Sequence, residues 1–225
     1  MHVWTIAVAE SIQASIFGNS RMVHFCNYKT TLGTPDMTLD QLRADFDARS
    51  KRSLSLPIAG LVVWCIVGAF GMILPPKAAT FALVFATGAI FPLAMAIARL
   101  RGEQLIENDN PLARLMGVCV LMVNLLWAVH IPLLMRAPQF VPLSLGIALG
   151  LHWMVYSWII AHPLGYRHAM LRTAGLVAVW FAFPGHAVTA SAFVVVATYA
   201  MTIVEMRTRP AIDQGGGTRL DRAAA

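Results

Sequence analysis

The sequence predicts an all-α protein, a polytopic transmembrane helix bundle with six spans preceded by a short amphipathic interfacial helix. Of its 225 residues, 58% are hydrophobic and only 12% are charged, and its mean hydropathy is +0.66. Soluble domains contain about 45–50% apolar and about 25% charged residues, so this chain has too few charges to solvate a globule. Its apolar residues also form long blocks, each of bilayer-spanning length. These observations exclude a soluble enzyme, a disordered chain and a nucleic-acid-binding domain.

Residues 1–36 differ from the rest of the chain. The apolar run Val3–Ala9 ends at Glu10, which makes it too short for a span, and no basic segment precedes it as in a signal peptide. The polar stretch that follows shows no periodicity. Two interpretations stay open for this segment: a disordered N-terminal extension, or an untranslated stretch with the true start at Met37.

Residues 37–55 are expected to form an amphipathic cytoplasmic helix ahead of the first span. Thr38 and Gln41 have the spacing of a capping box, in which each side chain bonds the other residue's backbone N–H. Leu39, Leu42 and Phe46 then recur at helical spacing. The charged residues on the other faces are Arg43, Asp45, Asp47 and Arg49. We therefore expect a helix over 38–52 that lies at the membrane interface.

Four apolar segments follow, none of which contains Asp, Glu, Lys or Arg. They are Leu56–Leu74, Ala78–Ala98, Leu115–Met135 and Val141–Ile160. Each has about 19–21 residues, enough to cross roughly 30 Å of hydrocarbon at about 1.5 Å per residue. Pro92 and Pro132 predict kinks in the second and third spans.

The last apolar region, residues 173–204, has 32 uncharged residues interrupted by Pro184-Gly185. It is too long for one span and short for two. We expect the chain to turn at Pro184-Gly185 and the fifth helix to begin near Tyr166, with Arg167 and Arg172 snorkelling to the surface. The six-helix transmembrane domain then covers residues 56–206, and residues 207–225 form a disordered cytoplasmic tail.

The distribution of basic residues predicts the orientation. Six spans place thirteen of the seventeen Lys and Arg residues at one end of the bundle, and only Lys77 and Arg136 at the other. Arg21 and Lys29 of the N-terminal segment complete the set. Cytoplasmic loops carry the excess of positive charge, so both termini are expected in the cytoplasm. This asymmetry also explains the net charge of +6 without a nucleic-acid partner.

Polar side chains within the spans are the candidate functional residues. Asn124 and His152 each lie eleven residues from the outer end of their span, about 16 Å deep and near the midplane, and Thr87 is roughly level with them. Tyr156 follows His152 by one turn on the same face. Two readings of this cluster stay open: hydrogen bonds that tie helices together, or a small polar pocket that binds a ligand.

Other motifs in the spans are less specific. Gly146 and Gly150 form a GxxxG motif in the fourth span, which permits close helix packing within the bundle or in a homo-oligomer. His130 and His152 differ in depth by six residues, about 9 Å, which is a poor geometry for two ligands of one haem iron. We expect no metal and no cofactor.

Several short phrases, in the same order along residues 38–165, resemble a family of small bacterial integral membrane proteins that is defined only as a domain of unknown function. The phrases are Leu42-Arg43-Ala44-Asp45-Phe46 with Arg49, Phe85 to Leu93, Asn110-Pro111-Leu112, Asn124, Pro142-Leu143, Gly150-Leu151-His152 and Tyr156-Ser157-Trp158. The resemblance implies a multi-pass protein of the bacterial inner membrane that begins near Met37. It implies no reaction, ligand or soluble partner.

Three hypotheses for function follow. A structural or accessory membrane protein comes first, and it predicts direct packing of Asn124 against His152. A small-molecule permease predicts a water-accessible pocket that reaches these two residues. A membrane-embedded enzyme comes last, because the chain has no known catalytic motif. Its richest polar segment is the loop Arg99–Arg114, with Glu103, Glu107 and Asp109.

Overall fold

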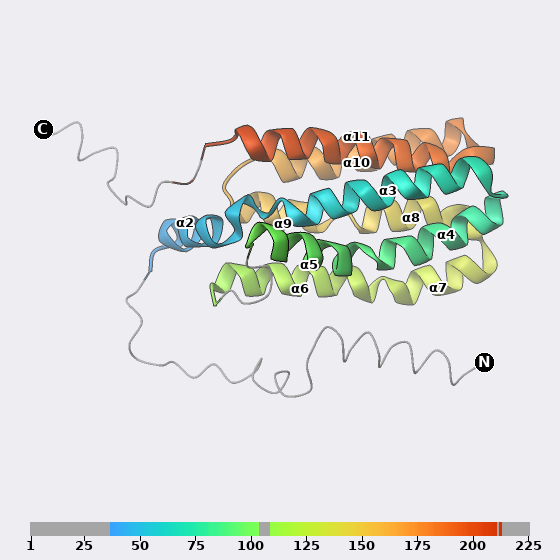
Figure 1. Cartoon of the computed structure of the whole chain (residues 1–225). Coiled ribbons are helices and arrows are strands. Elements are labelled where there is room, and N and C mark those ends of the chain that lie inside the picture. Colours follow the sequence, from blue (N-terminus) through green and yellow to red (C-terminus); the bar gives the residue numbers. More distant parts are fainter. Residues whose placement is uncertain (1–36, 104–108, 211, 213–225) are drawn as a thin grey trace, which may run out of the picture. The chain divides into compact units, whose positions relative to one another are not determined.

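The computed structural model describes residues 37–103, 109–210 and 212, except for the side chain of Ser53, and these residues form helices and their connections. The helices are α2 (Leu39–Ser50), α3 (Ser55–Ile73), α4 (Pro76–Gly88), α5 (Ile90–Arg101), α6 (Pro111–Leu125), α7 (Trp127–Arg136), α8 (Val141–Ala148), α9 (His152–Ile159), α10 (Leu164–Ala182) and α11 (Ala187–Thr208), with short 3-10 turns η2 (Lys51–Ser53), η3 (Pro138–Phe140) and η4 (Pro184–His186) (Figure 1). The expectations for residues 1–36, and for residues 213–225 of the tail, fall outside the described residues.

Helix α2 begins with the predicted capping box. Thr38 Oγ1 accepts a hydrogen bond from the Gln41 N–H (3.3 Å), and Gln41 Oε1 accepts one from the Thr38 N–H (2.8 Å). The helix packs across one end of the bundle, which we name the α2 end, and buries Phe46 and Asp47 there. The Phe46 ring meets the ring of Tyr156 in α9 edge-on at 6.4 Å.

The second and third spans are each divided into two helices. The division between α4 and α5 lies at Ala89, and Pro92 explains it because proline has no N–H and its ring collides with the carbonyl four residues earlier, at Gly88. The division between α6 and α7 lies at Leu126, whose N–H bonds to Val123 O at 3.2 Å. Both proline-containing spans are thus interrupted near the predicted kinks.

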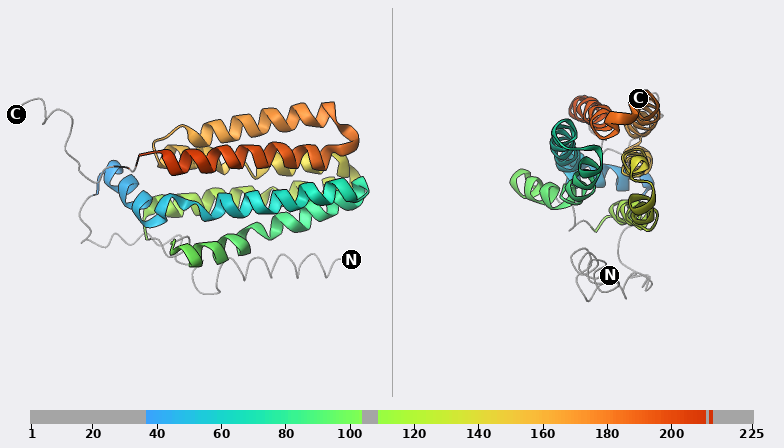
Figure 2. Two further views of the ribbon diagram at one scale, coloured as in Figure 1. Left: turned by 45° about the horizontal axis from the view of Figure 1, so that its top comes forward. Right: turned by 90° about the vertical axis from the view of Figure 1, so that its right-hand side faces the viewer.

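The fourth span is divided into α8 and α9 at residues 149–151, which the sequence analysis does not predict. Residue 150 is a glycine, and glycine is a poor helix former in a helix interior. The end-on view shows these helices running alongside the others in one bundle (Figure 2).

Five segments are long and apolar enough to cross a membrane. They are Ser55–Ile73, Pro76–Arg101, Pro111–Arg136, Pro138–Ile159 and Pro184–Thr208. Helix α10 is not among them, although it has 19 residues. Arg167, His168 and Arg172 lower its hydropathy. The structure therefore supports a multi-pass membrane protein with five candidate spans, and composition alone does not make α10 the sixth.

The outward faces of the bundle are apolar. Phe85 is 77% exposed and Phe193 is 76% exposed, and both lie on candidate spans. A soluble protein rarely leaves large apolar patches in water, whereas lipid covers such side chains. This surface agrees with a bundle that sits in a bilayer.

Inside the bundle, two glycines allow very close helix contacts. A Cβ on Gly60 of α3 would lie 2.5 Å from the Tyr199 ring of α11, and one on Gly165 of α10 would lie 1.9 Å from the Trp153 carbonyl oxygen of α9. Such positions tolerate only glycine, so they fix how α3, α9, α10 and α11 pack.

Helix α11 ends later than expected. It continues through Arg207 to Thr208, and Arg209 is buried at the α2 end, although the predicted tail begins at residue 207. Arg209 contacts Asp47 of α2 there, as described below.

Candidate functional site

The break in the fourth span frees a carbonyl group in the middle of the bundle. The Gly150 N–H bonds to Ile147 O at 2.8 Å, one residue short of the helical partner Gly146 O. The Gly146 oxygen instead accepts a hydrogen bond from Nε of Arg172 in α10, at 2.7 Å. A backbone carbonyl without a partner would be costly in a membrane interior, so Arg172 compensates for the break.

The two glycines of the GxxxG motif make room for this contact. A Cβ on Gly150 would lie 2.9 Å from Cδ of Arg172, and a Cβ on Gly146 would lie 2.8 Å from Cδ1 of Leu176. Both glycines therefore bring α8 against α10 within the bundle. A homo-oligomer through the fourth span stays a prediction.

The Arg172 side chain is completely buried, with 0% exposure. The expectation that it snorkels to the surface is wrong, because Gly150 leaves space beside α8 and Gly146 supplies an acceptor. Its guanidinium carbon lies 5.5 Å from the ring centre of Trp64 and 5.4 Å from that of Tyr199. Both terminal nitrogens, Nη1 and Nη2, have no hydrogen-bond partner within the described residues.

The contacts of Arg172 are with rings and a carbonyl group, and none is with an anion. A cation–π contact contributes about 0.5–2 kcal/mol, and a hydrogen bond to a charged group contributes about 1.5–3 kcal/mol. A buried ion costs several kcal/mol even after relaxation, and it is usually stabilised by a counter-ion. No carboxylate among the described residues pairs with Arg172. Arg172 is therefore a buried cation without a carboxylate partner among the described residues.

Arg172 lies near the middle of the bundle's depth. It is eight residues from the start of α10, and Trp64 and Tyr199 are each nine residues from the corresponding ends of α3 and α11. At 1.5 Å per residue, these distances are about 12–14 Å, close to half of the roughly 30 Å hydrocarbon thickness.

His168 lies one helical turn before Arg172 and is also completely buried. Its ring stacks on Trp153 with centres 4.4 Å apart, and its Nδ1 lies 2.8 Å from the hydroxyl oxygen of Thr202. The other ring nitrogen, Nε2, has no partner among the described residues. We name Trp64, Trp153, His168, Arg172 and Tyr199 the arginine cluster.

The predicted midplane residues are only partly brought together. Asn124 donates to Val120 O in its own helix (3.0 Å), and Thr87 donates to Leu83 O in its own helix (3.0 Å). Among the described hydrogen bonds, none joins Asn124 to His152. Whether these residues bind a ligand stays a prediction.

His152 and Tyr156 both lie next to the arginine cluster. The half-buried His152 ring is 5.7 Å from that of Trp153, and the Tyr156 ring is 5.4 Å from Trp153 on the side toward α2. Sequence spacing thus identifies two neighbours of the cluster, and it does not identify Arg172 or His168 as site residues. The signal for Arg172 was a charge next to an uncharged 32-residue run, together with glycines at 146 and 150.

A second set of polar contacts holds the α2 end together. Asp47 and Arg209 form a buried ion pair, with Nη1 of Arg209 3.2 Å from Oδ2 of Asp47, and a second contact between the same groups. Burial by itself would lower the pKa of Arg209, but hydrogen bonds to Asp47 and Tyr156 and the charge of Asp47 raise it. This pair joins α2 to the end of α11.

The loop between α5 and α6 contains the polar residues that the enzyme hypothesis names as candidates. Glu103 is buried there and accepts hydrogen bonds from the Ser55 N–H (3.0 Å) and from Arg101. Asn110 accepts from the Leu112 N–H (2.8 Å) and so caps α6. The described part of this loop therefore has structural roles, and residues 104–108 lie outside the described residues.

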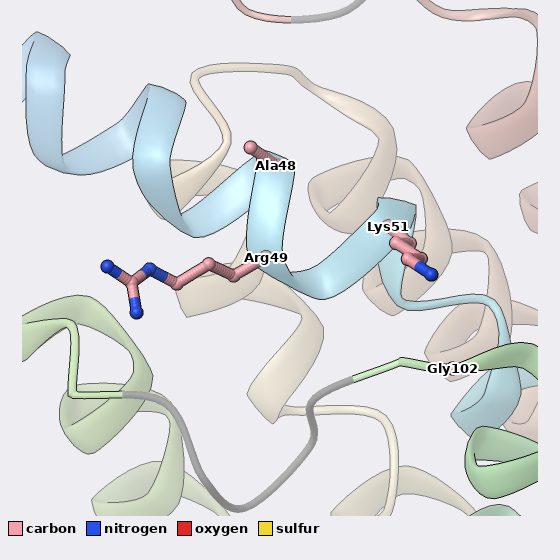
Figure 3. Close-up of a pocket in the computed structure, with 4 residues that line it drawn as sticks. All are labelled: Ala48, Arg49, Lys51 and Gly102. Carbon is pink, nitrogen blue, oxygen red and sulfur yellow. The ribbon is translucent and has the colours of Figure 1, made fainter.

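Two surface cavities lie away from the arginine cluster. One of about 380 Å³, between α2 and α5, is lined by Ala48, Arg49, Lys51 and Gly102 (Figure 3). Lys51 lies beside Gly102, where a cation suits the negative end of α5. The other, of about 300 Å³, is an apolar cavity between α10 and α11. Neither is lined by Arg172 or His168.

Comparison with known proteins places the chain in a family. The sequence profile of a family of unknown function, DUF7010, matches residues 39–209. The chain belongs to this family. The match covers α2 and every candidate span, and it agrees with the resemblance seen in the sequence. Searches of curated proteins and of solved structures find no match to this DUF7010 chain.

Proposed function

We propose that this DUF7010 protein is a carrier for a small anion in the bacterial inner membrane, with Arg172 as the residue that binds the anion. One observation carries the proposal: a completely buried guanidinium at mid-depth, with both terminal nitrogens unpaired within the described residues. Charged side chains inside membranes typically mark substrate or ion pathways. A bound anion would supply the charge and the acceptors that the helices do not.

The size of the anion follows from the packing around the guanidinium. The two rings of Trp64 and Tyr199 lie about 5.5 Å away, and neither described cavity is lined by Arg172. This favours a halide or a planar oxyanion of a few atoms, such as nitrate or formate. A planar oxyanion also matches the fork geometry of a guanidinium.

The carrier would cross the membrane six times, with α10 as the fifth span and both termini in the cytoplasm. Two contacts support this arrangement. Arg209 at the end of α11 meets Asp47 of α2, and Trp180 near the end of α10 donates to Gln139 O (3.0 Å) at the opposite end of the bundle. Helix α10 therefore extends from one end to the other, over about 28 Å for 19 residues.

The test is a thermal unfolding series in mild detergent with sodium chloride, nitrate or formate, against gluconate at constant ionic strength. A ligand that binds only the folded state raises the melting temperature in a saturable way. We expect this rise for at least one small anion and its loss in Arg172→Met. The control Arg167→Met changes an exposed arginine of the same helix and should keep the rise.

The response to anions separates this proposal from a second candidate, a structural or accessory membrane protein. The close contacts at Gly60 and Gly165 favour that candidate, because they fit a rigid bundle. Arg172→Met removes the hydrogen bond to Gly146 O, so its melting temperature without anions is expected to fall for either candidate. If Arg172 served only to hold helices together, no small anion would raise the melting temperature of the wild type. No saturable rise for any of the three anions, or an equal rise in Arg172→Met, overturns the carrier proposal.

A further inference from the structure

We infer that the anion at Arg172 is bound together with one proton, and that Nε2 of His168 is the proton-binding atom. The inference rests on the proposed function and deepens it, from an anion carrier to a proton–anion symporter. The proton comes from water and binds to the ring nitrogen lone pair, so no bond of the anion is made or broken.

The hydrogen bonds of α11 determine which ring nitrogen of His168 is free. Thr202 donates its hydroxyl hydrogen to Thr198 O at 2.8 Å. A hydroxyl has one hydrogen, so Thr202 Oγ1 acts as the acceptor toward His168, and Nδ1 of His168 is the donor. In the neutral ring Nε2 then carries no hydrogen. It is a buried lone pair without a donor in the described residues.

The groups that face His168 couple its protonation to the anion. Arg172 lies one turn away on α10, His152 lies across Trp153 on α9, and Tyr199 faces the His168 ring from α11 with centres 5.1 Å apart. Arg172 is the one permanent cation of this set, and in a low-dielectric interior it opposes a second positive charge nearby. A bound anion neutralises Arg172 and removes that opposition. Each ligand therefore strengthens the binding of the other.

The charge balance has a direct consequence for transport. The empty site carries the charge of Arg172, and the site with an anion and a proton carries the same net charge. An exchange between these two states moves no net charge with the ligands across the membrane. Carriage is thus electroneutral and independent of membrane potential.

A surface group lies on the proton's route from the α2 end. Glu205 follows Thr202 by three residues on α11, so the two side chains share a face. Its carboxylate pairs with Arg167 and lies 3.7 Å from Nδ1 of His162. Glu205 and His162 are half-buried, and Arg167 is exposed, so this group of acid and base side chains reaches the solvent from the α11 face that carries Thr202.

The experiment measures proton uptake when nitrate binds. Nitrate carries no proton near neutral pH, so any proton taken up goes to the protein. Purified protein in weakly buffered detergent solution is titrated with sodium nitrate between pH 5 and 8, with a pH indicator as the readout. We expect about one proton per bound nitrate at the optimum pH, and uptake in His168→Asn should be lost while nitrate binding persists. The Asn side chain keeps a donor for Thr202 but has no Nε2 lone pair.

His186→Asn is the matched control, since His186 is exposed at the opposite end of the bundle and should keep the uptake. A second measurement needs no variant: nitrate uptake into liposomes should respond to an inward proton gradient and not to an imposed potential. Nitrate binding without proton uptake at any pH, or potential-driven uptake, overturns the symport inference and leaves the anion carrier standing. If nitrate, chloride and formate all fail to bind, both proposals fall.

Discussion

Arg172 stabilises the break in the fourth span, but two of its own nitrogens lack hydrogen-bond partners among the described residues. Its Nε satisfies the Gly146 carbonyl that the break in the fourth span exposes, while its terminal nitrogens stay without acceptors in the described structure. In the same side chain, Nε therefore has a structural role, and the two terminal nitrogens have unused hydrogen-bond donors. Only the terminal nitrogens require a ligand. The variants of Arg172 and Arg167 are therefore compared by their response to anions.

The close contact at Gly165 predicts that a substitution by alanine destabilises the protein. In Gly165→Ala, the new Cβ would lie 1.9 Å from a backbone oxygen, Trp153 O, so the helices must move apart. Overpacking of this kind costs about 1–3 kcal/mol or more, and we expect that loss in the free energy of unfolding measured by denaturing-detergent titration. Gly117→Ala is the control, because no atom lies within 4 Å of its Cβ position. Equal stability of the two variants would contradict the packing.

Local signals were predicted well at this scale, and distant ones were not. The Thr38–Gln41 capping box involves residues three positions apart, and sequence spacing alone specifies it. The contact between Arg172 and Gly146 spans 26 residues and depends on which helices are neighbours. Periodicity does not contain that information.

Among the elements, α2 is attached to the bundle through polar groups as well as through Phe46. Besides the Asp47–Arg209 pair, Asn110 donates to Leu42 O (2.8 Å), and Arg43 donates to Trp158 O (3.2 Å). The sequence predicted the helix, and its position at the membrane interface stays a prediction; its polar contacts with the bundle were not predicted. Its charged residues looked like a solvated face, because the partners of Asp47 and Arg43 lie more than a hundred residues away.

Breaking the buried pair should detach α2. Removing one partner of a buried ion pair typically costs about 3–5 kcal/mol, so Asp47→Ala should lose stability and expose the arginines of α2 to trypsin. Asp40→Ala removes an acid whose side chain is 88% exposed in its pair with Arg43. An exposed pair contributes about 0–1 kcal/mol. Equal trypsin rates for the two variants would show that Asp47 does not hold the helix.

Acid should loosen the link between α2 and α6. Burial by itself would raise the pKa of Asp45, but hydrogen bonds from Arg49 (2.8 Å) and Asn110 (2.9 Å), with the charge of Arg49, hold it below its ordinary value of 3.8. A depressed pKa means that the carboxylate stabilises the fold above pH 4 or so. This contribution is lost as the pH falls further.

The measurement is the rate of hydrogen exchange in α2 between pH 6 and pH 3, corrected for intrinsic exchange. We expect protection to fall at the acid end in the wild type. Asp45→Asn should lower protection at pH 6 and flatten this dependence. A steep acid loss that persists in Asp45→Asn would assign the effect to another carboxylate.

For the whole molecule, the central question is whether α10 crosses the membrane. Composition finds five candidate spans, while the contacts at both ends of α10 favour six. Sequence patterning was sufficient to predict an all-α membrane bundle, because long uncharged apolar runs form few structures other than membrane-spanning helices. It was weakest at α10, where a buried arginine reduces the very hydropathy on which the pattern depends.

Cysteine labelling from outside the cell tests the number of crossings. With the three native cysteines replaced by alanine, Gly185→Cys should react with a membrane-impermeant maleimide in spheroplasts. Asp40→Cys is the control for the α2 end and should react only after permeabilisation. If α10 stayed on the cytoplasmic side, both positions would require permeabilisation.

The Asp47–Arg209 pair also sets an order of events during synthesis. Asp47 leaves the ribosome before the first span, and Arg209 follows the last, 162 residues later. The pair cannot form until Arg209, after the last candidate span, has been synthesised. Phe46 can be covered earlier, because its ring partner Tyr156 lies in α9. A chain truncated before Arg209 would instead leave the carboxylate of Asp47, which is 6% exposed in the finished protein, without its basic partner. That unpaired acid would be a mark of incomplete assembly, available to chaperones and membrane proteases.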